Sequence, residues 1–350
     1  MNSKPYEAPL ALIGDLGATH TRLALVCGDE RICSKSYSTQ AALSLEALLE
    51  DFLDTEAGDL AQYGGLKGAC LGVAGHVSRG EAHLTNVGWR VSEVSIQRLL
   101  GAPTLLVNDF YAQAVAMPLL SQDSLVHICG PKHLVPESGR SFGVLGAGSG
   151  LGEAILVSPQ SDAISARQQV ETQVLADDWL VVPTEGGHCR FAPRNEEEVK
   201  LNRWLQGRYG EHISVERVVS GAGLVDLFYY FLGEQDLPVG FSEPVKGAQI
   251  TQAAFERGCE ISLETISHFV GIYADEAANL TLKSNAGVVF LSGGVTPHLL
   301  PMIHKEFPSH FVKKGRYQSL LADVSVWVVT KTDPGLFGAR ALAERLIQSF

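Results

Sequence analysis

One plan occurs twice in this chain: an apolar run, a short turn containing glycine, and a second apolar run. The first copy spans residues 10–26 and the second spans residues 142–157. Short apolar runs bounded by turn residues are typical of buried strands, so each copy predicts a strand–turn–strand unit. When the copies are laid over one another, Gly14 falls on Gly146. Two such units, far apart in the chain, indicate a molecule with two related α/β halves.

The first turn carries groups that suit a phosphate. Gly17 lets the backbone approach a ligand closely, and consecutive N–H groups in such a turn can form a concave site for an anion. Thr19 and Thr21 add hydroxyl donors, Arg22 adds a guanidinium, and Asp15 could hold Mg²⁺ through water. The same stretch also fits an ordinary β-hairpin with a glycine turn, and the second copy is what favours a ligand site.

The composition limits the partners. The chain has 350 residues, 45% of them hydrophobic and 19% charged, which is enough to bury the cores of two domains. Its net charge of −12 disfavours a nucleic-acid partner, because phosphates require a basic surface. The sequence has no apolar run long enough for a membrane span and no apolar signal region at residues 1–5, so we expect a cytoplasmic protein with no membrane partner. The six cysteines are scattered without a CxxC pair, which favours neither a disulfide framework nor a thiolate zinc site.

Two adjacent polar residues stand where a buried strand opens into a helix. Residues 103–107 read as the strand, Asn108 and Asp109 follow it, and residues 110–120 have helical character. Asn and Asp are common helix caps, so a purely structural role is one interpretation. The other is a ligand site, in which the helix dipole keeps Asp109 ionised and able to accept a proton.

A second polar group lies on a tight loop. Glu185 and His188 flank two glycines, and no second ligand pair with metal-site spacing accompanies them. Donors and acceptors on one loop suit the vicinal hydroxyls of a sugar. Glu216 remains open to two interpretations, a structural ion pair or a ligand contact. The glycine pair Gly293 and Gly294 ends another buried strand and would permit a flat base to approach the backbone.

Two further stretches concern structure. The acidic run at residues 196–198 begins a helix after Asn195 and is expected to form a solvated face. Residues 249–283 have long helical periodicity, with breaks expected near Gly258 and Gly271.

These motifs, in this order and spacing, resemble bacterial glucokinases, the hexokinase-like branch of the actin-like ATPase superfamily. The resemblance spans nearly the whole chain. Its carriers are residues 14–19, 108–110, 146–152, 185–188, 191–193, 216–221, 293–294 and 334–336.

The resemblance implies a two-domain α/β fold of the actin-like ATPase (ribonuclease H-like) type, with the active site in the cleft between the domains. It implies phosphorylation of the 6-hydroxyl of glucose by ATP with Mg²⁺, and a homodimer. We expect a smaller domain at 1–109 plus 333–350 and a larger domain at 110–332. Asp109 matches the carboxylate that accepts the hydroxyl proton. The implied sugar-binding residues are Asn108, Asp109, Glu185, His188 and Glu216. The implied ATP-binding residues are Gly14, Asp15, Leu16, Gly17, Ala18, Thr19, Gly148, Ser149, Gly293 and Gly294.

The chain departs from the family pattern at three places. Gly is usual where Ala18 stands, Asn is often found where His20 stands, and residues 158–178 form a longer connection than is typical. The first two motivate a second hypothesis, a non-catalytic sugar- or nucleotide-sensing protein on the same fold. A kinase for another hexose is a further alternative. A nucleotide-dependent dehydrogenase is disfavoured, because residues 146–152 do not match GxGxxG.

Overall fold

The computed structural model describes residues 8–17, 19–58, 60–84, 87–137, 139–157 and 179–350. Ala18 and the connection at 158–178 therefore lie outside the described residues. The chain divides into two compact units. Unit 1 contains the residues up to Leu119 and those from Thr332 onward, with 179–181, and unit 2 contains the remainder of the described chain.

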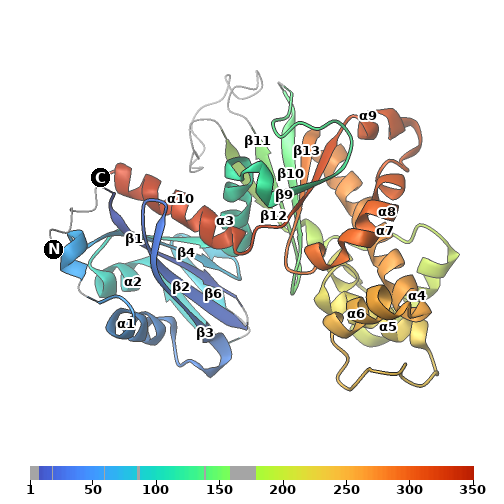
Figure 1. Ribbon diagram of the computed structural model, residues 1–350, viewed down its shortest axis with the longest axis horizontal. Helices are drawn as coiled ribbons and strands as arrows, with labels where there is room; N and C mark the ends of the chain where they lie inside the picture. Colours follow the sequence, from blue (N-terminus) through green and yellow to red (C-terminus); the bar gives the residue numbers. More distant parts are fainter. Residues whose placement is uncertain (1–7, 18, 59, 85–86, 138, 158–178) are drawn as a thin grey trace. The chain divides into compact units, whose positions relative to one another are not determined.

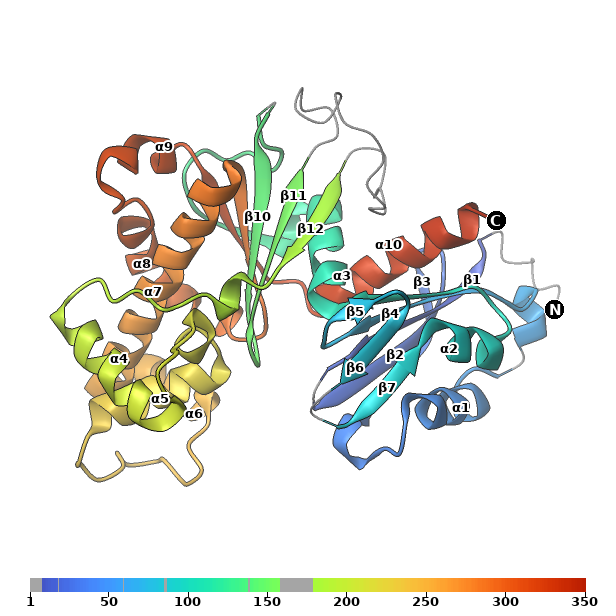
Figure 2. The ribbon, with the colours of Figure 1, turned by 180° about the vertical axis from the view of Figure 1, so that it is seen from behind.

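Unit 1 is built on a five-stranded sheet in the order β3-β2-β1-β4-β8. β1 pairs antiparallel with β2 and parallel with β4, and β8 continues the parallel part. Helices α3 and α10 lie on one face of this sheet, and α1 and α2 lie on the other (Figures 1 and 2). The sheet strands are β1 (Leu10–Leu16), β2 (His20–Cys27), β3 (Glu30–Ser38), β4 (Leu66–Val73) and β8 (Thr104–Asn108). The helices are α1 (Leu45–Thr55), α2 (Glu93–Leu100), α3 (Asp109–Ala116) and α10 (Pro334–Gln348). A small second sheet contains β5 (Val77–Ser78), β6 (Glu81–Leu84) and β7 (Trp89–Ser92).

Unit 1 extends past the predicted domain boundary after Asp109. Helix α3 begins at that residue and packs against α10, so it belongs to the same compact body as the sheet. The core of unit 1 lies between the sheet and α1, whose Leu45, Leu49 and Phe52 are fully buried. Ser44 caps α1 by accepting a hydrogen bond from the N–H of Ala47, as polar residues before an apolar helical stripe commonly do.

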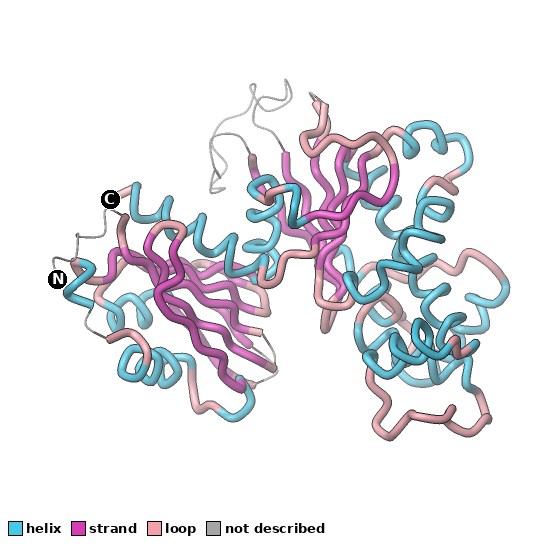
Figure 3. The backbone as a smooth tube through the Cα atoms, in the orientation of Figure 1, coloured by secondary structure: helices cyan, strands magenta, loops and turns pink. Residues whose placement is uncertain are grey.

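Unit 2 is built on a six-stranded sheet in the order β12-β11-β10-β13-β14-β9, and it has its own core. Figure 3 shows these strands with the long helix α7 and its neighbours. The strands are β9 (Leu125–Cys129), β10 (Ser141–Ala147), β11 (Leu151–Val157), β12 (Leu180–Thr184), β13 (Ala286–Ser292) and β14 (Ser325–Val329). The helices are α4 (Glu196–Tyr209), α5 (Gly221–Leu232), α6 (Gly247–Arg257), α7 (Glu260–Ser284), α8 (Leu300–Phe311) and α9 (Gln318–Ala322).

The two sheets repeat one topology, which confirms the predicted internal duplication. β12-β11-β10-β13-β14 follows the same order and strand directions around its first hairpin as β3-β2-β1-β4-β8. The predicted match between the two hairpins, which placed Gly14 on Gly146, is wrong by one residue. The pair nearest the turn is Leu16 with Thr21 in one hairpin and Ala147 with Leu151 in the other, so Asp15, and not Gly14, corresponds to Gly146.

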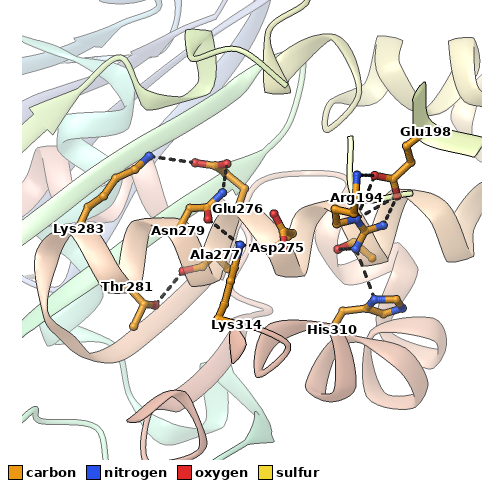
Figure 4. Close-up of polar contacts among 11 residues, drawn as sticks. Arg194, Glu198, Asp275, Glu276, Ala277, Asn279, Thr281, Lys283, His310 and Lys314 are labelled. Atoms are coloured by element: carbon orange, nitrogen blue, oxygen red, sulfur yellow. Dashed lines mark hydrogen bonds and ion pairs between the residues drawn. The ribbon is translucent and has the colours of Figure 1, made fainter. Parts of the chain in front are cut away.

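The acidic run at the start of α4 is not a solvated face throughout. The Glu198 side chain is fully buried and accepts hydrogen bonds from Nε of Arg194 at 2.9 and 3.1 Å (Figure 4). The Arg194 guanidinium also donates to the carbonyl of Gly271 and lies 3.4 Å from Nδ1 of His310. The predicted break at Gly271 is also wrong. α7 continues through it, and a methyl group added there would lie 2.8 Å from the Arg194 guanidinium.

The helix break predicted near Gly258 is confirmed, because α6 ends there with Gly258 in the left-handed conformation at φ 67°. Across the described ranges, no helix combines the length and the apolar character needed to cross a bilayer.

Candidate functional site

In unit 1, Asp15 lies near the end of β1 beside two other charged residues. Arg22, its partner across the hairpin, has Nη1 3.9 Å from Oδ2 of Asp15. The same guanidinium donates to the carboxylate of Asp333, which precedes helix α10 in a left-handed conformation at φ 59°. Burial raises the pKa of the Asp15 carboxyl, Arg22 opposes this and Asp333 reinforces it. A carboxylate with a raised pKa beside a second carboxylate would be stabilised as an anion by a bound cation.

The first turn is held by bonds within the chain. The N–H of Gly17 donates to the carbonyl of His20 at 2.9 Å, so this N–H is already engaged. The hydroxyl of Thr21 is buried and lies 3.0 Å from the hydroxyl of Thr39, which donates to the Gly17 carbonyl. Thr21 therefore stabilises the turn and is not a ligand donor, whereas Thr19 is exposed.

Two of the predicted nucleotide residues in this hairpin are core positions. Leu16 is fully buried, so only its backbone is available to a ligand. A methyl group added to Gly14 would lie 2.6 Å from the Leu71 side chain on the neighbouring strand, which explains why glycine is needed there.

Asn108 and Asp109 stand where β8 meets α3, as the sequence predicts. Oδ1 of Asn108 accepts from the N–H groups of Phe110 and Tyr111, both at 3.0 Å, and its amide donates to the Gly75 carbonyl at 3.0 Å. Asn108 is therefore the helix cap. Its side-chain amide carries a second hydrogen, which none of these bonds uses. Oδ1 of Asp109 accepts from the N–H of Phe110 at 2.8 Å. Both side chains are half-buried at the N-terminus of α3, where the helix dipole favours the ionised carboxylate.

In unit 2, Glu185, His188 and Glu216 come together. Nε2 of His188 lies 3.8 Å from Oε2 of Glu185, and Nδ1 lies 4.0 Å from Oε1 of Glu216. Glu185 and His188 bracket the short 3₁₀ turn η5 (Gly186–His188), and Glu216 lies in a second turn, η6 (Val215–Arg217). The side chains of Glu185 and His188 are 75% and 63% exposed, so they are accessible to a ligand in this unit.

Glu216 is also a structural contact. Its Oε2 accepts from the N–H of Leu151 at 3.0 Å, at the first residue of β11. A methyl group added to Gly150 would lie 2.4 Å from the same oxygen. Glycine at this position therefore makes room for the Glu216 carboxylate. Both interpretations of Glu216 survive, since Oε1 still points toward His188.

The four nucleotide residues predicted in unit 2, Gly148, Ser149, Gly293 and Gly294, also come together. A methyl group added to Gly148 would meet its nearest atom, the N of Gly294, at 4.0 Å. Gly293 is tightly packed, with φ 88° and the Ala147 carbonyl oxygen 2.3 Å from the place of a methyl group. Ser149 is exposed beside them. Two glycine turns thus form one small surface with room above Gly148 and Gly294.

Glu153 is a residue that our sequence analysis missed. It lies on β11, is 3% exposed, and its carboxyl group packs against Gly186 of the turn that carries Glu185 and His188. Burial raises its pKa to about 8, Glu276 adds to the rise, and Lys283 opposes it. The signal in the sequence is one charged residue inside an apolar strand, at 151–157.

Comparison with known proteins gives a consistent result. The family model described as "Glucokinase" matches residues 12–346. The glucokinase of Yersinia enterocolitica is 33% identical over 337 residues, which are 95% of this chain and 95% of that protein.

Two solved structures show the fold. The glucokinase of Balamuthia mandrillaris, in complex with glucose, superposes with a TM-score of 0.78 at 21% identity, over 97% of this chain and 94% of that one. The ROK family glucokinase of Streptomyces griseus, in complex with glucose and AMPPNP, superposes with a TM-score of 0.64 at 18% identity, over 96% and 99%. The predicted fold class, the two-domain α/β fold of these sugar kinases, is confirmed.

Proposed function

The chain belongs to the glucokinase family, and from this premise we propose that it transfers the γ-phosphoryl group of ATP to the 6-hydroxyl of glucose, giving glucose 6-phosphate and ADP. The observation that carries the proposal is the meeting of Glu185, His188 and Glu216 in unit 2. Two carboxylates and an imidazole offer both acceptors and a donor, which vicinal sugar hydroxyls require. The Streptomyces griseus relative, solved with glucose and AMPPNP, supports a sugar and ATP as the pair of substrates.

Asp109 is the proposed general base. Phosphoryl transfer needs little covalent chemistry from the protein, and a positioned carboxylate that accepts the hydroxyl proton is one of the recurring parts. The position of Asp109 at the N-terminus of α3 favours its ionised form. The remaining amide hydrogen of Asn108, whose other bonds hold the start of α3, is the proposed donor to the sugar from this unit.

The proposed nucleotide residues are the two glycine turns of unit 2, at Gly148 and Gly294, with the turn after β1 in unit 1. Asp15 fits Mg²⁺ held through water, since Mg²⁺ prefers carboxylate oxygens and keeps several of its waters. Burial and the neighbouring Asp333 raise the pKa of Asp15 by leaving its negative charge poorly stabilised, and a nearby cation would stabilise that charge, while Arg22 limits the total negative charge there. When bound, Mg²⁺ would neutralise the charge of the phosphates.

Three further features are part of the proposal and follow from the family resemblance. They are a homodimer, a cytoplasmic location, and a division into a smaller domain at 1–109 plus 333–350 and a larger domain at 110–332. Size-exclusion chromatography with light scattering would test the dimer directly.

A coupled assay of ADP release with Mg-ATP tests the function. The purified chain is offered glucose, mannose, fructose, glucosamine or no sugar. We expect turnover that depends on glucose and only a small background without sugar. If only another hexose supports turnover, that hexose and not glucose is the substrate. Glucose binding by calorimetry without ADP release would instead favour the sensing protein.

A further inference from the structure

Glu153 occupies the space that a side chain at position 186 would need. A methyl group added to Gly186 would lie 1.9 Å from Oε2 of Glu153 and 2.6 Å from its Cδ. The backbone is tied at the same place, because the hydroxyl of Thr184 donates to the Glu153 carbonyl at 3.2 Å and accepts from the N–H of Gly186 at 3.2 Å. Strand β11 thus supports the start of the turn through both its backbone and the Glu153 carboxyl group.

The same end of β11 supports the rest of the group. A methyl group added to Gly187 would lie 2.1 Å from the carbonyl oxygen of Leu151, so the second glycine of the turn rests directly on that residue. The N–H of Leu151 binds Glu216. Residues 151–153 therefore set the position of the turn at Glu185 and His188 relative to Glu216.

The Glu153 carboxyl group has little to stabilise a negative charge. Oε1 is buried without a hydrogen-bond partner among the described residues. The charged groups that act on it come from α7: Glu276, which raises its pKa, and Lys283, which lowers it. Lys283 lies 3.6 Å from Glu276, with which it pairs (Figure 4). Tyr273 of the same helix is fully buried, and its pKa is raised in part by Glu153, while Glu185 adjoins Gly186 in the turn.

We infer that Glu153 is a positioning residue for sugar binding: its uncharged carboxyl group packs on Gly186 and holds the turn that carries Glu185 and His188. This inference rests on the proposed function of that turn. A buried carboxylate without a partner is costly, so the turn is in place while Glu153 holds its proton and is disturbed when the proton leaves. Since the pKa of this group is about 8, the affinity for the sugar falls in mildly alkaline solution.

The test compares the KM for glucose and the KM for ATP from pH 6 to pH 9.5 in three proteins. In the wild type, we expect the KM for glucose to increase when the pH is higher than about 8. The KM for ATP should stay constant over the same range. Glu153→Gln keeps the shape of the uncharged acid, so its KM for glucose matches the wild type at pH 7 and stays flat. Glu153→Ala removes the support at every pH. We expect its KM for glucose to rise about tenfold or more, because small displacements of binding groups have effects of at least this size.

Glu276→Gln is the matched control for charge. It removes the neighbour that raises the pKa of Glu153, so the rise in the KM for glucose moves to lower pH. The inference is overturned if Glu153→Gln shows the wild-type pH dependence, or if Glu153→Ala raises both KM values equally.

Hydrogen exchange of the amides at 184–188 tests the positioning without any assay of activity. We expect faster exchange in Glu153→Ala and wild-type exchange in Glu153→Gln at pH 7. Unchanged exchange in Glu153→Ala would refute the inference even in an active kinase. A chain that shows the exchange effect but no glucose-dependent turnover would instead refute the proposed function. If Glu153→Ala fails to fold, the pH profile of Glu153→Gln still decides.

Discussion

Replacement of Gly150 by alanine should weaken glucose binding, although the residue lies in the turn assigned to the nucleotide. The new methyl group would lie 2.4 Å from Oε2 of Glu216 and 3.1 Å from its Cδ. Real side chains do not approach so closely, and the flexible carboxylate moves more easily than the backbone. The 3.0 Å bond from the N–H of Leu151 to Glu216 is then lost.

The size of the effect follows from that bond. Hydrogen bonds to charged groups contribute about 1.5–3 kcal/mol. The Glu216 side chain is 28% exposed, so solvent screens it in part and the lower end applies. About 1.4 kcal/mol corresponds to a factor of ten. We therefore expect the KM for glucose to rise about tenfold and the KM for ATP to change little, both measured by coupled ADP release.

A double-mutant cycle decides whether the effect passes through Glu216. In a Glu216→Ala background, Gly150→Ala should add almost nothing, because the displaced group is already gone. Gly148→Ala is the steric control in the same turn, since its methyl group meets no atom closer than 4.0 Å. It should leave the KM for glucose unchanged and raise the KM for ATP. An equal tenfold effect of Gly150→Ala with and without Glu216 would refute this reasoning.

Four further outcomes are expected. Asp109→Asn should lose on the order of 10²-fold or more in kcat, the scale of general-base catalysis, and near-normal turnover would remove the base assignment. Gly293→Ala should lower the melting temperature strongly, because φ is 88° and the Ala147 carbonyl blocks the methyl group, and calorimetry would show it. Arg194→Met should cost about 3–5 kcal/mol in urea unfolding, since buried Glu198 loses its partner, and a loss below 1 kcal/mol would contradict the pairing. Between the ordinary value of 4.5 and about 8, the folded chain holds a proton on Glu153 that the unfolded chain has lost. The unfolding free energy of the wild type relative to Glu153→Gln should therefore fall by about 1.4 kcal/mol per pH unit in that range, and parallel pH curves would argue against a raised pKa.

The elements that the sequence predicts well are those set by local patterns. The two apolar hairpins appear as β1–β2 and β10–β11, and Asn108 stands at the start of α3, because strand length and helix capping depend on neighbours in the sequence. The one-residue error in matching the hairpins arose because an apolar run indicates a strand but not its pairing register. The pairs Leu16 with Thr21 and Ala147 with Leu151, which end the two hairpins, fix the correspondence, and they depend on hydrogen bonds that the sequence pattern does not show.

The errors concern residues that are buried by contacts between distant segments. Glu198 reads as a surface acid in a run of three, and its partner Arg194 is only four residues away. The cluster is buried because Arg194 also donates to the carbonyl of Gly271, 77 residues further along the chain, which no local pattern contains. Gly271 reads as a helix break for the same reason, since its role is to admit a guanidinium from another segment. Burial of a charge depends on which segments meet, and periodicity carries no such information.

The sequence shows that unit 2 has glycines in its turns, but it does not show why glycine is required at each position. Gly150, Gly186 and Gly187 are not needed for a positive φ. Each is needed because a carboxylate or carbonyl oxygen from another segment fills the place of its side chain. Leu151 follows the proposed nucleotide turn directly and also contacts both Gly187 and Glu216, so a shift of that turn can reach the proposed sugar residues through the start of β11. The Gly148 carbonyl also accepts a hydrogen bond from the N–H of Gly221 at 2.7 Å, which is a second link. Coupling between the two substrates therefore has a route within one unit, and the Gly150→Ala cycle measures how much of the effect on glucose binding passes through Glu216.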